Sequence, residues 1–294
     1  MKNYRRIEAL IPHHWTEGTI NANGIVQHFY RTGGNHPPLI LLHGLMAGAL
    51  TWMRVAQGLE TEYDILIVDA RGHGHSERIH SGFSTDLLVE DVASLIPALN
   101  LDKPRLLGHS MGGTTAALLA ARYPDLIRSL VLEESVWGDQ AGIPPAVMQS
   151  EGYQAWLKTY VDYLRNLKTQ NHTERMVAGL AQLPPGSGIW PEEEFVPMVK
   201  AQSQLDLELV TRGPELWSAM QPGAPLAELV RRITCPILLL TGGHGNCDPR
   251  VVEQVLAASH NGEHVNFENA GHLVHLDEFD RFISVVKAFY KDRG

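Results

Sequence analysis

Short apolar runs alternate with amphipathic stretches along most of the chain. Each run is bounded by turn residues, as in PPLILLHG and PILLLTGG, which is typical of a buried strand in a parallel sheet. These runs predict strands at residues 37–44, 63–72, 104–110, 129–135, 236–243 and 263–271. Helical spacing of apolar residues predicts helices at residues 84–98, 111–123, 249–259 and 277–291. The alternation predicts an α/β fold with a mostly parallel sheet and helices on both faces.

The stretch of residues 138–227 interrupts this alternation. It contains helical patterns at 146–170 and 191–211, each preceded by a proline pair, Pro144-Pro145 and Pro184-Pro185. A long structureless loop inside a compact domain is unusual. We therefore expect a helical cap, or lid, inserted into a core built from residues 1–137 and 228–294.

Charge and cysteine usage exclude several classes of function. The 294 residues include 33 acidic and 24 basic ones, a net charge of −9, so the chain has no basic footprint for nucleic acid or an anionic membrane. The apolar stretch IEALI near the N-terminus is too short for a signal peptide or a membrane span, which favours a cytoplasmic protein.

Cys235 and Cys247 form no CxxC pattern, and paired histidines such as His13 and His14 lack further donors at ligand spacing. We expect no metal, no cofactor and a small-molecule partner.

The motif that points to chemistry is G-x-S-x-G at residues 108–112. It lies between a predicted strand and a predicted helix, the context that a nucleophile elbow requires. Ser110 is then the candidate nucleophile on a strained turn, and the glycines at both ends leave room for closely packed backbone. The helix that begins near Met111 directs its N-terminal N–H groups at the site, which favours a developing negative charge.

Two further segments support this interpretation. The loop that follows the strand at 37–44 can supply a second oxyanion donor through the backbone N–H of Leu45. His272 follows the last predicted strand, at the edge where open α/β sheets bind ligands, and is the candidate general base. His275 lies one helical turn away and is an alternative base.

Four ordered motifs resemble those of the α/β-hydrolase superfamily: HG at 43–44, DARGHGHS at 69–76, GHSMGG at 108–113 and AGHLVHLDEF at 270–279. The resemblance implies an eight-stranded, mostly parallel sheet with a cap after the sixth strand. It also implies that Ser110 is the nucleophile, that His272 is the base, and that the N–H groups of Leu45 and Met111 form the oxyanion hole. Members with an aspartate nucleophile, such as epoxide hydrolases, are disfavoured because position 110 is Ser.

The carboxylate that would orient His272 has two candidates. The family position after the seventh strand holds glycines, in TGGHGNCDPRVV. Asp248 can replace the missing acid if this loop is lengthened, or it can simply cap the next helix. Glu134, at the end of the sixth strand, needs no insertion, and some lactonases of the superfamily resemble this arrangement. We favour Glu134, while strand alternation directs Glu133 to the opposite face.

The predicted cap is rich in aromatic and methionine side chains, which favours a small apolar or aromatic substrate. The candidate substrate-binding residues are Trp137, Trp156, Trp190 and Trp217. We expect a serine hydrolase that cleaves a carboxylic ester or lactone through an acyl-enzyme. An amide or a carbon–carbon bond beside a ketone is the first alternative. A hydrolase-like ligand receptor with little or no turnover is the second.

Overall fold

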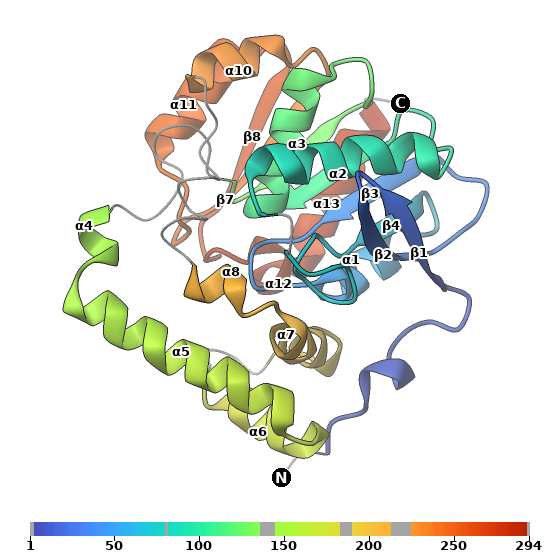
Figure 1. The fold of residues 1–294 in the computed structure, drawn as a ribbon. Helices are drawn as coiled ribbons and strands as arrows, with labels where there is room; N and C mark the ends of the chain where they lie inside the picture. Colours follow the sequence, from blue (N-terminus) through green and yellow to red (C-terminus); the bar gives the residue numbers. More distant parts are fainter. Residues whose placement is uncertain (1–2, 80–81, 136–144, 183–189, 213–224, 293–294) are drawn as a thin grey trace.

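The computed structural model describes residues 3–79, 82–135, 145–182, 190–212 and 225–292, in which helices cover both faces of a central sheet (Figure 1). The strands are β1 (Thr16–Ala22), β2 (Ile25–Arg31), β3 (Pro38–Leu42), β4 (Asp64–Val68), β5 (Arg105–His109), β6 (Leu130–Glu133), β7 (Ile237–Gly242) and β8 (Gly262–Phe267). The helices outside the predicted cap are η1 (Ile7–Ala9), η2 (Ala49–Trp52), α1 (Met53–Leu59), α2 (Thr85–Ala98), α3 (Met111–Arg122), α10 (Leu226–Arg232), α11 (Pro249–Ala258), α12 (Val274–Asp277) and α13 (Phe279–Asp292).

The sheet has the strand order β1-β2-β4-β3-β5-β6-β7-β8. All neighbouring pairs from β4 to β8 are parallel, and only β2 runs antiparallel to its neighbours β1 and β4. The eight-stranded, mostly parallel sheet predicted from the sequence is therefore confirmed. Because β3, β5, β6 and β7 run in the same direction, the loops that follow them meet at one edge.

Alternate residues of the central strands enter two separate cores. Leu39 and Leu41 of β3 belong to a cluster with α1 and α13, whereas Ile40 and Leu42 belong to a cluster with α2, α3, α10 and α11. All four side chains are buried because the strand has helices on both faces. This explains why the central strands read as continuous apolar runs in the sequence.

Two details of the strand prediction were wrong. Residues 16–31, to which apolar runs assign no strand, form the hairpin of β1 and β2. The hairpin turns at Asn23 and Gly24, whose φ angles of 51° and 74° suit the Asn-Gly pair. The predicted buried strand at 263–271 is instead an edge strand, β8, and several of its residues are exposed. Polar residues are tolerated there because one side of the strand has no partner.

The predicted interruption of the α/β alternation is occupied by helices in the structure. Its helices are α4 (Pro145–Met148), α5 (Glu151–Thr169), α6 (His172–Leu180), α7 (Glu192–Gln204) and α8 (Glu208–Thr211). Helix α7 packs against η2 and α1 of the core, whereas α5 and α6 lie on its outer side (Figure 1). Arg54 of α1 pairs with the buried Glu194 of α7. The start of the predicted cap at residue 138 lies outside the described residues, so its boundaries stay a prediction.

Candidate active site

Ser110 occupies the turn between β5 and α3. Its φ of 49° and ψ of −114° lie in a region that residues with a side chain rarely adopt, as is typical of functional turns. A Cβ on Gly108 would lie 2.5 Å from the backbone of Gly112, and a Cβ on Gly112 would lie 2.2 Å from the carbonyl oxygen of Leu42. The glycines of the G-x-S-x-G motif therefore allow α3 to approach β3 and β5 closely.

The loop after β3, residues 43–48, lies beside Ser110; it is called the oxyanion loop below, after its predicted role. A Cβ on Gly44 would be 3.4 Å from the Cβ of Ser110, and the next residue along this loop is Leu45. Within the described residues, the N–H groups of Leu45 and Met111 donate to no protein acceptor. The structure thus brings both predicted oxyanion donors next to the serine and leaves their N–H groups available to a ligand.

Asp69, the first residue of DARGHGHS, holds this loop in place. Its carboxylate accepts the N–H of Ala49 at 2.7 Å and the Nδ1–H of His28 at 2.8 Å. A Cβ on Gly74, which has a φ of 51°, would lie 2.1 Å from the carboxylate, so glycine is required there. The DARGHGHS motif therefore shapes the oxyanion loop without contributing a reacting group, a role that the sequence pattern alone did not reveal.

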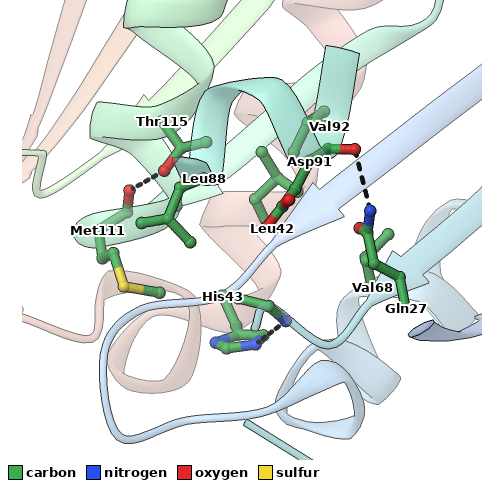
Figure 2. Close-up of a pocket in the computed structure, with 11 residues that line it drawn as sticks. Gln27, Leu42, His43, Val68, Leu88, Asp91, Val92, Met111 and Thr115 are labelled. Atoms are coloured by element: carbon green, nitrogen blue, oxygen red, sulfur yellow. Dashed lines mark hydrogen bonds between the residues drawn. The ribbon is translucent and has the colours of Figure 1, made fainter. Parts of the chain in front are cut away.

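A small cavity lies behind the elbow (Figure 2). His43 at the start of the oxyanion loop and Met111 at the start of α3 both line it, and the N–H of Ala70 donates to Nε2 of His43 at 3.0 Å. Its volume of about 20 Å³ is enough for about one water molecule. This space is too small for an organic substrate, which must approach Ser110 from elsewhere.

Glu134 follows β6 and has its carboxylate beside His272. Oε2 accepts the Nδ1–H of His272 at 3.1 Å and the N–H of Asn246 at 2.6 Å, and Oε1 accepts the N–H of Gly242 at 2.8 Å. The side chain is fully buried. Burial alone would raise the pKa of Glu134, but these three hydrogen bonds outweigh it and hold the pKa below its usual value. The carboxylate is therefore ionised and ready to stabilise a cationic His272.

The glycine-rich loop after β7 surrounds this carboxylate. Gly242 and Asn246 donate to it, and a Cβ on Gly245 would lie 2.1 Å from Oε1 of Glu134. A side chain on Gly242 would also collide with the carbonyl oxygen of Gly271, at 2.2 Å. The loop that lacks an acid at the family position thus provides both space and N–H donors for an acid from the neighbouring strand.

Asp248, the other candidate acid, is held away from His272 by local contacts. It is the N-cap of α11, where its carboxylate accepts the N–H of Arg250 at 2.8 Å and pairs with the Arg250 guanidinium at 2.6 Å. These hydrogen bonds to Arg250 lower the pKa of Asp248. The geometry therefore gives Asp248 the capping role and corrects the alternative in which it reaches back to His272, because both of its oxygens already have partners within two residues.

A second glutamate–histidine pair lies next to the first. Glu133, the last residue of β6, accepts both the backbone N–H and the Nδ1–H of His275 at 2.8 Å. Strand alternation ends at Glu134, whose φ is 46°, so two consecutive glutamates reach two histidines of the same segment. His275 is buried, whereas the side chain of His272 is 32% exposed. Only His272 is therefore open to a substrate, which disfavours His275 as the base.

A family model described as the alpha/beta hydrolase fold matches residues 37–279. The chain belongs to the α/β-hydrolase family. The matched range includes the elbow, the oxyanion loop, Glu134 and His272, so the candidate site lies entirely within the part of the chain that is shared with the family.

Known hydrolases of several kinds are similar to this α/β-hydrolase. It is 28% identical to an N-formylmaleamate deformylase of Pseudomonas putida, over 92% of this chain and 95% of the relative. It is also 28% identical to a soluble epoxide hydrolase of Corynebacterium, over 86% and 89% of the two chains. Among solved structures, an N-formylmaleamic acid deformylase of P. putida aligns with a TM-score of 0.74 at 22% identity, over 92% of this chain and all of that chain. These comparisons support a hydrolase and leave its bond open.

The structure describes two of the four predicted substrate-binding tryptophans, Trp156 and Trp190. Trp156 is 48% exposed on α5, where it stacks on Tyr160, and α5 lies on the outer side of α7. Trp190 packs against the main hydrophobic core. Trp137 and Trp217 lie outside the described residues. Periodicity could not distinguish a pocket residue from one on an outer helix, because both lie in amphipathic segments.

The described part of this α/β-hydrolase contains no group of three or more His, Cys, Asp or Glu side chains arranged to hold a metal ion. None of its described helices is both long enough and apolar enough to cross a membrane.

Proposed function

We propose that this α/β-hydrolase cleaves a small, apolar or aromatic carboxylic ester or lactone through an acyl-enzyme on Ser110. The observation that carries the proposal is the arrangement of a strained serine, two available backbone N–H groups and a histidine bonded to a buried carboxylate. Hydrolysis of an acyl bond uses each of these groups. The family match and the similarity to other hydrolases support the same reaction type.

In the first half-reaction, the Ser110 oxygen attacks the carbonyl carbon while His272 accepts the hydroxyl proton. The N–H groups of Leu45 and Met111 bind the oxyanion of the tetrahedral intermediate, where preorganised donors lower the barrier most. Collapse of the intermediate breaks the bond to the leaving alcohol, which takes the proton from His272. Because His272 is cationic in between, the buried Glu134 carboxylate stabilises this stage.

In the second half-reaction, water replaces the alcohol. His272 takes a proton from the water, the hydroxide adds to the acyl carbon, and the same oxyanion site is used again. Collapse then releases the carboxylic acid and returns the proton to Ser110. A lactone follows these steps with its alcohol still attached to the acyl chain, so the product is one hydroxy acid.

Cleavage of an amide is a second candidate. A relative that spans nearly the whole chain is named an N-formylmaleamate deformylase, and a further relative, matched over 34% of this chain, is named a 2-(acetamidomethylene)succinate hydrolase. The same groups can cleave an amide if His272 protonates the leaving nitrogen before the intermediate collapses. The bond is therefore tested directly, with matched ester, lactone and amide substrates.

The test combines labelling with a substrate panel. A fluorophosphonate probe should label Ser110 of the wild-type protein, and Ser110→Ala should abolish labelling and lower turnover by at least about 10³-fold while the protein stays folded. Ser150→Ala, in an exposed helix cap, is the control and should retain activity. Aryl esters and lactones should be hydrolysed faster than matched N-formyl amides and vinylogous diketones. Tight ligand binding without labelling would indicate a receptor and overturn the proposal.

A further inference from the structure

Three buried residues adjoin the proposed catalytic residues without taking part in the reaction. His109 directly precedes Ser110, Glu133 directly precedes Glu134, and His275 follows His272 by three residues. Their exposed fractions are 5%, 0% and 3%. The reaction proposed above assigns no proton or charge to any of them, so their polar side chains require another explanation.

The carboxylate of Glu133 holds residues 271–277, the segment that carries His272, at His275. The carboxylate of Glu133 accepts the backbone N–H of His275 at 2.8 Å, which fixes the chain, and its ring Nδ1–H at 2.8 Å, which fixes the ring. The His275 ring also lies 4.4 Å from the ring of Trp52 and 6.0 Å from that of Phe282. Main chain and side chain of His275 are therefore tied to β6 and to the core.

His109 holds the same segment at His272 itself. Its Nε2–H donates to the carbonyl oxygen of His272 at 2.9 Å, and its ring centroid lies 4.7 Å from that of His272. Burial lowers the pKa of His109 to about 4, so the ring is neutral at physiological pH and this hydrogen bond determines its tautomer. A donor on the residue before the nucleophile thus controls where the main chain of the base lies.

The His272 ring has few other constraints. Its side chain is 32% exposed, and within the described residues its ring hydrogen-bonds to Glu134 and packs on His109. The N–H of the preceding residue, Gly271, donates to Asp277, which closes the segment on itself without linking it to the sheet. The links from this segment to β5 and β6 are therefore made by His109, Glu133 and Glu134.

We infer that His109, Glu133 and His275 are positioning residues that fix the His272 segment, so that its ring meets Glu134 on one side and Ser110 on the other. This inference rests on the proposed function. Its physical reason is that proton transfer requires the base within a few tenths of an ångström of its working position, and a misplacement of about 1 Å costs about 100-fold in rate. Ser110 directly follows β5 and Glu134 directly follows β6. Anchoring the His272 segment to these strands therefore fixes the positions of all three side chains relative to one another.

Matched substitutions at His109 and His275 separate a hydrogen bond from mere packing. His109→Gln keeps a donor near the position of Nε2, and His109→Leu removes it. His275→Asn keeps a donor near the position of Nδ1, and His275→Phe removes it. For each variant, the extent of fluorophosphonate labelling counts the intact sites, and kcat is expressed per labelled site. Loss of folded protein lowers the labelled fraction and leaves this normalised kcat unchanged.

We expect His109→Leu and His275→Phe to lower kcat per labelled site by about 10- to 100-fold with KM within about twofold, and the donor-keeping variants to stay within about threefold of wild type. Equal normalised kcat in both members of each pair would overturn the inference while the proposed function stands. Absence of labelling in the wild-type protein would instead overturn the proposed function and the inference with it. If His275→Phe does not fold, the His109 pair decides.

Discussion

The carboxylate of Glu134 accepts the Nδ1–H of His272 at 3.1 Å, although the two residues are 138 positions apart in the chain. The backbone N–H groups of Asn246, in the loop after β7, and of Gly242, at the end of β7, donate to the same carboxylate at 2.6 and 2.8 Å. The carboxylate therefore remains ionised and oriented in a fully buried site, which is the condition under which it can stabilise a protonated histidine.

Replacement of Glu134 should cost far more activity than replacement of Asp248. Glu134→Gln removes the charge while keeping the size of the side chain, and we expect kcat to fall by about 10²- to 10⁴-fold, as when other triads lose their acid. Asp248→Asn should change kcat by less than about threefold, because in the described part of the chain the carboxylate of Asp248 bonds to Arg250 at its own helix start. Steady-state kinetics on the same ester checks both. A large loss in Asp248→Asn alone would reverse the assignment.

Gly245→Ala should impair the site by steric conflict. The new methyl group would lie 2.1 Å from Oε1 of a carboxylate that three hydrogen bonds hold in place, so Glu134 or the loop must move. We expect a fall of about 10-fold or more in kcat, with a lower melting temperature. Gly152→Ala is the matched control: it lies in α5 with no atom within 4 Å of the new Cβ and should be neutral or slightly stabilising. Unchanged kcat in Gly245→Ala would contradict this prediction, because it would show that the loop can move away from Glu134 without loss of catalysis.

The ion pair of Arg71 and Asp91 should be important for stability. Both groups are buried and joined by two hydrogen bonds of 2.6 Å. Asp91→Ala leaves a buried guanidinium without its partner and should lower the free energy of unfolding by about 3–5 kcal/mol in urea titrations. Asp86→Ala, which breaks an exposed pair with Arg122, should cost less than about 1 kcal/mol. Equal losses in the two variants would contradict this ranking.

Buried neutral histidines should make the protein less stable in mild acid. Burial lowers the pKa of His73 to about 3 and of His109 to about 4, so between these values and about 6.5 the unfolded chain binds protons that the folded chain does not. Their contribution to stability is present above pH 6.5 and is lost as the pH falls. The raised pKa of His28 acts in the opposite direction, so a paired comparison is needed.

His73→Asn supplies that comparison, because it keeps a donor toward the carbonyl oxygen of Arg71 and removes the titration. From pH 7 to pH 5, the free energy of unfolding should fall by about 2 kcal/mol more in the wild type than in the variant. Urea titrations at the two pH values measure this difference. Parallel losses in the two proteins would show that His73 does not contribute to the acid sensitivity.

Local patterns were sufficient to predict most of the fold and part of the site. The apolar runs that became β3 to β7 are continuous because helices cover both faces of the sheet, and Gly108-His109-Ser110-Met111-Gly112 marks the elbow by itself. The hairpin of β1 and β2 was missed because β1 is partly exposed and carries few apolar residues, and because Gln27 and His28 interrupt the apolar residues of β2, although Asn23-Gly24 was a usable turn signal. The assignment of the tryptophans to a substrate pocket stays a prediction, because composition does not specify which side of a helix faces the site.

The sequence by itself determined the chain order of the sheet elements, the strained serine and the histidine that follows the last strand, since each depends on residues close together in the chain. Only the tertiary structure decided which carboxylate meets that histidine. Read along the chain, both Glu134 and Asp248 are candidates, with Glu134 favoured, but β6 and β7 are adjacent, and Gly245 leaves space where a side chain would block Glu134. Asp248, meanwhile, is held by Arg250. A contact across 138 residues depends on how strands pair, and no local pattern encodes that pairing.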